Sequence, residues 1–219
     1  MTHSPKAIYF KLFITGILCL WSITVSGQSK INTYQSSFQT DAYLQHWAGT
    51  LPHFNLSAFK YTRTGDFENI MLEDRWKGND PSYRQTFGKL ISYSPGKKNY
   101  LDFYSGQIVF DTLRSNGKEQ VTISTDVDQY LLLGDYASKK TIRLLFMGSS
   151  SFLEEAAWIS DSTFILVGTT NEQNYFVPFI YIGDLKKRQF YCYLPDNKNI
   201  KRDTIYHSPK WKLLKGVNM

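Results

Sequence analysis

Glu154 and Glu155 are adjacent carboxylates, the residue type that performs acid–base chemistry in many hydrolases. Two carboxylates can act as acid and base on one bond only if both side chains reach it. On a β-strand, however, neighbouring side chains point to opposite faces. The sequence therefore predicts that this pair begins a strand in contact with solvent and does not form a catalytic dyad.

Three aspartates offer other possible sites. Asp126 and Asp128 form an Asp-x-Asp pattern, but the further oxygen ligands and the glycine of a calcium loop are missing, so a turn is predicted. Asp102 lies between two apolar residues in a predicted strand. We expect its side chain to face solvent, with a position in a pocket as the alternative.

No motif for covalent, metal or phosphate chemistry is present. The chain lacks Gly-x-Ser-x-Gly, His-Glu-x-x-His, Cys-x-x-Cys and a Walker-type loop. His46 and His53 have no carboxylate or thiol at ligand spacing. Cys192 alternates with apolar residues, which predicts a buried, inert thiol. We therefore predict no catalytic residue, no bound metal and no cofactor.

Basic residues lie in four of the five odd-numbered turns of the predicted strand series between residues 96 and 188. The exceptions to the alternation are Asp161 on the basic side and Lys198, Lys201 and Arg202 on the acidic side. In an up-and-down arrangement, alternate turns lie on the same edge. The pattern predicts a basic rim that attracts phosphates or acidic glycans, opposite an acidic rim. The alternative is that these charges only keep the turns solvated. The candidate anion contacts are Lys97, Lys98, Arg114, Lys118, Lys139, Lys140, Lys186, Lys187 and Arg188.

Aromatic side chains make up 16% of the chain, and exposed ones suit stacking on sugars or contact with a protein. Four Tyr and Trp side chains of the irregular N-terminal half, where burial in a strand core is not expected, are the better candidates for such contacts. The candidate aromatic contacts are Trp47, Tyr61, Trp76 and Tyr83.

The first 27 residues have the architecture of a secretion signal. Lys6 and Lys11 precede an apolar run from Leu12 to Val25, and small residues follow up to Gly27. A membrane anchor is the alternative, but the run is short for a span of about 30 Å. We expect cleavage near Gly27 and an exported protein, which is periplasmic, on the cell surface or secreted.

Residues 28–219 then form one domain of ordinary size. Loss of Lys6 and Lys11 lowers the formal charge from +6 to +4. This mild basic balance, together with export, argues against nucleic acid as a partner. No later apolar run is long enough to span a membrane.

The elements that must position these residues are mostly strands. The sequence of residues 28–88 predicts an irregular part with one helix within residues 36–49, capped by Thr40 or Ser37 and ended by Gly49. Residues 89–215 predict a meander, and Ala156–Gly168 is its clearest hairpin. The predicted fold is an all-β antiparallel meander with the helix packed on it. Strands are predicted near residues 89–94, 99–104, 107–113, 119–124, 129–134, 141–147, 152–159, 163–169, 175–183, 189–194 and 203–207.

A Ser after a strand, then a polar turn and an aromatic residue, recurs at Ser94, Ser124 and Ser160, and "FIYIGDLKKRQFYCYL" follows the third. At these residues, about 90–210, the chain resembles β-propeller blades of the WD40-like and TolB-like families. The resemblance implies a propeller-like arrangement, with an up-and-down barrel or a sandwich as alternatives. The overall pattern also looks like uncharacterised secreted bacterial proteins, which implies no activity.

These observations favour a non-enzymatic binding protein whose partner is an envelope protein or a glycan. A hydrolase of envelope carbohydrate is the alternative. A cleft with converging carboxylates would favour the hydrolase, and an aromatic or basic surface without one would favour binding.

Overall fold

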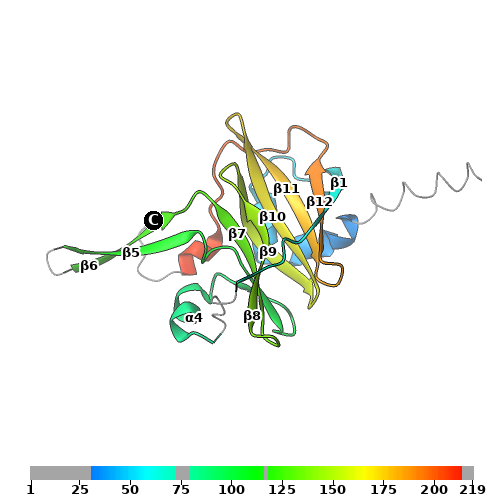
Figure 1. Cartoon of the computed structure of the whole chain (residues 1–219). Coiled ribbons are helices and arrows are strands. Elements are labelled where there is room, and N and C mark those ends of the chain that lie inside the picture. The colour runs from blue at the N-terminus through cyan, green and yellow to red at the C-terminus, as the bar shows by residue number, and fades with distance from the viewer. Residues whose placement is uncertain (1–30, 73–78, 116–117, 214–219) are drawn as a thin grey trace, which may run out of the picture.

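The computed structural model describes residues 31–72, 79–115 and 118–213, with only the backbone described for residues 109–115 and 118–125. This part of the chain is mostly β, in two five-stranded sheets and a hairpin, with a few short helices (Figure 1). The prediction of an all-β antiparallel meander is confirmed in part: the fold is antiparallel and mostly β, but it includes several short helices, and the described strands do not close into a barrel. The predicted signal, residues 1–27, lies outside the described residues.

Sheet A is built from the last four strands of the chain and one early strand, all antiparallel to their neighbours. The four late strands follow one another as hairpins, as their apolar runs and polar breaks predict. Its spatial order is β1 (Phe59–Asp66), β12 (Gln189–Pro195), β11 (Tyr175–Asp184), β10 (Thr163–Glu172) and β9 (Ser151–Ser160).

Sheet B and a separate hairpin hold the remaining strands. The hairpin of β5 (Ile108–Ser115) and β6 (Lys118–Thr125) projects away from both sheets (Figure 1). The predicted strand at 203–207 does not form, and only a single bridge joins Arg202 to Phe176. The order of sheet B is β2 (Ile70–Leu72), β8 (Lys140–Met147), β7 (Gln129–Asp135), β4 (Asn99–Asp102) and β3 (Ser92–Tyr93).

The central strands of sheet A are buried on both faces. In β10, Phe164 and Leu166 belong to a core shared with sheet B, whereas Ile165 and Val167 belong to a second core under the N-terminal helices. This is the period-two alternation of a strand with an apolar layer on each side. The helices are η1 (Ile31–Tyr34), α2 (Gln35–Thr40), α3 (Ala42–Gly49), η2 (Leu56–Ala58), α4 (Pro81–Phe87) and η4 (Pro209–Leu213).

The predicted helix is two helices. Thr40 ends α2, and Asp41 caps α3 because its Oδ1 accepts hydrogen bonds from the backbone N–H groups of Tyr43 and Leu44, both at 2.9 Å. The prediction of a Thr40 or Ser37 cap is therefore wrong for α3. Its packing on the sheet is confirmed, because Leu44 and Trp47 lie in the core with β10 and β11.

A bulge interrupts β9 where it pairs with β10. Val167 lies opposite Glu155 and Gly168 lies opposite Leu153, so Glu154 has no partner in the ladder. A side chain at Gly168 would meet the Phe152 carbonyl oxygen and the Phe179 ring, so the close approach at the bulge requires a glycine.

Candidate functional site

Glu154 and Glu155 are both buried, with 8% and 0% of their surface exposed. We predicted that this pair starts a strand in contact with solvent and that its two side chains point to opposite faces, and this prediction is wrong. The bulge is the physical reason, because the extra residue breaks the strict alternation of the strand. Both carboxylates find partners on the side of sheet A that α3 covers.

Three donors from distant parts of the chain surround the Glu154 carboxylate. The Trp47 indole Nε1 donates to Oε2 at 2.7 Å, and the Thr169 hydroxyl donates to Oε1 at 2.7 Å. Arg202, itself 4% exposed, forms a buried ion pair with Oε1. Burial raises the pKa of the Glu154 carboxyl, and Arg202, Thr169 and Trp47 oppose that rise.

Glu155 has its own set of partners in the segment that follows Arg202. Lys210 Nζ lies 2.8 Å from Oε2, and the hydroxyls of Tyr206 and Ser208 donate to Oε1 at 2.9 and 2.5 Å. Lys210 also lies 4.4 Å from the centre of the Tyr43 ring on α3. Burial, with the nearby Glu155 charge, raises the pKa of Tyr206. Residues 206–210 are therefore held against β9.

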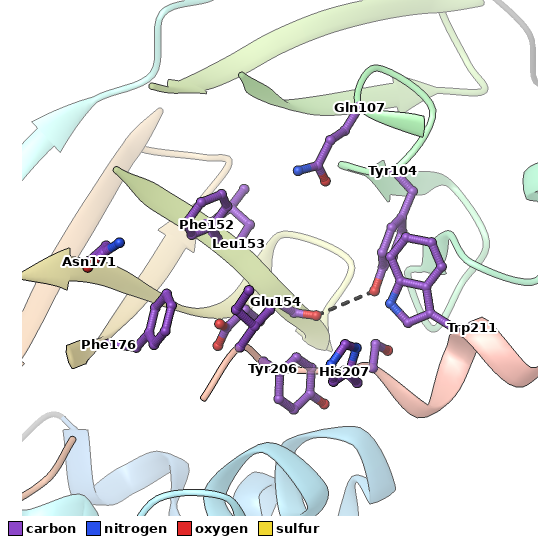
Figure 2. Close-up of a pocket in the computed structure, with 12 residues that line it drawn as sticks. Tyr104, Gln107, Phe152, Leu153, Glu154, Asn171, Phe176, Tyr206, His207 and Trp211 are labelled. Atoms are coloured by element: carbon purple, nitrogen blue, oxygen red, sulfur yellow. Dashed lines mark hydrogen bonds between the residues drawn. The ribbon is translucent and has the colours of Figure 1, made fainter. Parts of the chain in front are cut away.

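A pocket of about 450 Å³ opens between this segment, β9 and the loop before β5 (Figure 2). The Tyr104 and Trp211 rings meet edge to face with 5.7 Å between centroids. Tyr104 also donates its hydroxyl to the Glu154 backbone oxygen at 3.4 Å, the dashed line in Figure 2. The lining residues are Tyr104, Gln107, Phe152, Leu153, Glu154, Asn171, Phe176, Ile205, Tyr206, His207, Ser208 and Trp211.

Gln129 on β7 holds the part of β9 that lines this pocket, at Leu153, in place. Its side-chain amide donates to the Leu153 carbonyl at 3.0 Å and accepts from the Leu153 N–H at 2.7 Å. The same Nε2 donates to the Gln107 side chain at 3.2 Å. A buried amide that satisfies a strand backbone in this way holds β9 and the Gln107 loop at a fixed separation.

Asp102 is 1% exposed, so the prediction that it faces solvent is wrong. Its Oδ1 accepts from the N–H groups of Tyr104 and Ser105, both at 2.9 Å, and its Oδ2 accepts from the hydroxyls of Tyr83 and Ser105. Burial, followed by the Asp102 charge, raises the pKa of Tyr83. Asp102 thus shapes the loop that carries Tyr104 and Gln107 into the pocket.

The predicted aromatic contacts separate into three groups. Trp47 and Tyr83 are 0% and 6% exposed, so they are core residues and the prediction of surface contacts is wrong for them. Tyr61 on β1 is 40% exposed. Trp76 lies outside the described residues. The aromatic residues of the pocket lie between residues 104 and 211 instead, on strands and in the segments between and after them, where the sequence did not distinguish them from core residues.

The structure brings together three of the four predicted basic turns. The turn with Lys97 and Lys98 touches the β7–β8 turn, which holds Lys139 and Lys140, because Tyr136 N–H donates to the Lys98 carbonyl. The β9–β10 turn lies between the Lys97 turn and the turn with Lys186, Lys187 and Arg188. On one side the Gly96 N–H donates to the Asp161 side chain, and on the other the Leu185 N–H donates to the Ser162 carbonyl.

The fourth basic turn does not join this group. It lies at the tip of the β5–β6 hairpin, where residues 115 and 118 pair. The base of this hairpin, at Gln107 and Asp126, lies beside Gln129. Gln129 begins β7, whereas the three grouped turns lie near Asp135 at the other end of that strand. The side chains of Arg114 and Lys118 are outside the described ones. The rim that the alternation of turns predicts therefore has three basic turns.

Among residues 31–72, 79–115 and 118–213, no group of three His, Cys, Asp or Glu side chains has a metal-binding arrangement. No helix in this part of the chain has the length and apolarity to cross a membrane. Cys192 is a buried free thiol, as predicted. Comparison of the chain with protein-family models, curated proteins and solved structures finds no match.

Proposed function

We propose that this protein is an exported, non-enzymatic binding protein and that it holds a glycan in the pocket beside β9. One observation carries the proposal, a concave surface of about 450 Å³ in which aromatic rings surround a few polar groups. A volume of this size lies within the range of small-molecule sites in proteins. Export is part of the proposal because the predicted signal at residues 1–27 precedes the domain.

The chemistry of the lining suits a sugar. A pyranose ring has an apolar face of C–H groups, which packs on aromatic rings, and a rim of hydroxyls, which need donors and acceptors. Trp211, Phe176 and Tyr206 supply partly exposed rings. Gln107 and Asn171 supply amides that both donate and accept hydrogen bonds. His207, exposed at the pocket, adds a further polar group.

The carboxylates support binding in preference to hydrolysis. A glycosidase needs two carboxyl groups that reach the scissile bond. Among the described residues, Glu154 is the only carboxylate in the lining, and its oxygens accept from Trp47, Thr169 and Arg202. Glu155 is bound to Lys210 and does not line the pocket. Both charges are thus engaged in holding the fold around the pocket.

Propeller-like organisation stays a prediction. The described strands pair as two five-stranded sheets and one hairpin, and the resemblance to propeller blades at residues 90–210 adds nothing to the choice of ligand.

Titration of the purified protein with a panel of neutral oligosaccharides, followed by calorimetry and intrinsic fluorescence, tests the proposal. We expect at least one to bind with quenching of tryptophan emission, and Trp211→Ala to weaken it at least tenfold because stacking area is lost. Tyr61→Ala is the matched control, since it removes an exposed aromatic ring outside the pocket.

Phe176→Ala provides a second variant in case Trp211→Ala unfolds the protein, since Trp211 packs on the main core and Phe176 lies outside it. Equal weakening by Tyr61→Ala, or no binding at millimolar sugar, would refute the pocket as a glycan site. Release of new reducing ends during incubation would support the hydrolase instead.

A further inference from the structure

The three neighbouring basic turns share one backbone feature. Lys97, Lys139 and Arg188 all have positive φ values, of 51°, 54° and 59°. In two of the turns a carboxylate supports this conformation, because Asp135 accepts from the Ala137 N–H and Asp184 accepts from the N–H groups of Lys186 and Lys187. The turns are therefore defined structures that present their cations to solvent at one end of both sheets.

These cations have few negative partners. Lys98 pairs with Asp161 at 3.4 Å. Among the described residues, no carboxylate forms an ion pair with any other basic side chain of the three turns. Asp135 and Asp184, the nearest acidic residues in the chain, bind their own turns. The other six side chains are Lys97, Lys139, Lys140, Lys186, Lys187 and Arg188.

A second pocket, of about 480 Å³, lies at this end of sheet B. Arg84 and Gly88 border it from α4 and its C-terminal end, Lys97 from the β3–β4 turn, and Tyr93 and Tyr136 from β3 and the end of β7. Burial raises the pKa of Tyr93, Tyr136 adds to that rise and the Arg84 charge opposes it. Within the described part of the chain, Arg84 and Lys97 have no carboxylate in ion-pair contact.

We infer that this end of the molecule is a second binding site, in which the pocket between Arg84 and Lys97 seats one residue of a uronic acid polysaccharide. The two cations match a sugar carboxylate, and Tyr93 and Tyr136 match its ring and hydroxyls. The pocket has the volume of a small-molecule site, more than a single inorganic anion fills. The remaining lysines continue the positive surface for neighbouring sugar units.

This site is separate from the glycan pocket beside β9, and the two share no lining residue. Oligogalacturonate is the test ligand, and its methyl-esterified form is the matched neutral ligand, with the same backbone and no charge. We expect the acid to bind, the ester to bind at least tenfold more weakly, and the affinity for the acid to fall as NaCl rises from 50 to 500 mM.

The double variant R84Q/K97Q removes both pocket cations, and we expect it to weaken oligogalacturonate about fivefold or more, as loss of two exposed charge contacts would. Lys60→Gln is the matched control, because Lys60 lies near the start of β1, at the opposite end of sheet A from Asp66 and the β11–β12 turn. Trp211→Ala should leave this binding unchanged, which keeps the test independent of the first pocket.

Three results would overturn the inference. The first is equal binding of acid and ester, and the second is equal weakening by R84Q/K97Q and Lys60→Gln. The third is binding of inorganic phosphate or of phosphatidylglycerol vesicles, lost in R84Q/K97Q, without binding of oligogalacturonate. That last result would assign the basic end to a free anion or to a lipid surface.

Discussion

The indole Nε1 of Trp47 lies 2.7 Å from Oε2 of Glu154, and this hydrogen bond joins helix α3 to the bulge of β9. Both side chains are buried, so loss of the bond would leave a buried polar group without its partner. It connects the core under the helices with the edge of the pocket.

Trp47→Phe should destabilise the protein more than Trp158→Phe. Trp47 donates to a buried carboxylate, whereas Trp158 Nε1 donates to the neutral Ser92 carbonyl at 2.9 Å. Removing a donor from a buried charged group costs about 1.5–3 kcal/mol, against about 1 kcal/mol for a neutral bond. Urea denaturation of both variants measures the difference, and equal losses would contradict a charged Glu154.

Arg202→Met should cost about 3–5 kcal/mol, because it leaves the Glu154 carboxylate buried without its cation. Lys60→Met, which breaks the exposed pair with Asp196, should cost at most about 1 kcal/mol. Addition of Glu154→Gln to Arg202→Met should restore part of the loss, because position 154 then holds no unpaired buried charge. Chemical denaturation measures all three. The prediction fails if the two single variants lose the same stability.

Gly168→Ala should cost about 1–3 kcal/mol, because the new methyl group overlaps the Phe152 carbonyl oxygen and the Phe179 ring. Gly65→Ala in β1 should be close to neutral, since nothing lies within 4 Å of its added carbon. Thermal denaturation separates the two. A loss at Gly65 as large as that at Gly168 would show that strand propensity, not overlap at the bulge, decides the effect.

Stability should fall between pH 10 and pH 12. Burial raises the pKa of Tyr100 to about 12, whereas an unfolded tyrosine titrates near 10. The folded chain keeps a proton that the unfolded chain releases, so this contribution is complete below pH 10 and is lost as the pH rises toward 12.

Tyr100→Phe should therefore flatten the decline, by at most about 1.4 kcal/mol per pH unit. Tyr61→Phe, at an exposed position, should keep the slope of the unchanged protein. Denaturation curves at several alkaline pH values compare the slopes, and identical slopes for all three proteins would contradict the role of Tyr100.

The local sequence pattern was enough to predict the hairpins from Gln129 to Pro195, because the alternation of apolar and polar residues and the turn residues act between neighbours in sequence. It was not enough for β1, which pairs with β12 across more than a hundred residues. The same limit explains the carboxylates. A bulge depends on the partner strand, so the sequence around Glu154 does not reveal that Glu154 and Glu155 both find buried partners.

The partners of the two carboxylates are also nonlocal. Arg202 and Lys210 follow the strands in a stretch without periodicity, where a strand was predicted and none forms. The lining of the pocket could not be predicted for this reason. Its aromatic residues look like core residues in the sequence, and only the path of residues 205–211 along β9 leaves a concave surface between them.

Arg202 and Lys210 are synthesised after the two carboxylates that they neutralise, which gives them a further role. A ribosome makes Glu154 and Glu155 before Arg202 and Lys210, so the nascent chain carries two carboxylates whose countercharges do not yet exist. Burying them at that stage would be costly. We therefore expect the edge of sheet A at β9 to pack fully only once Arg202 and Lys210 are available.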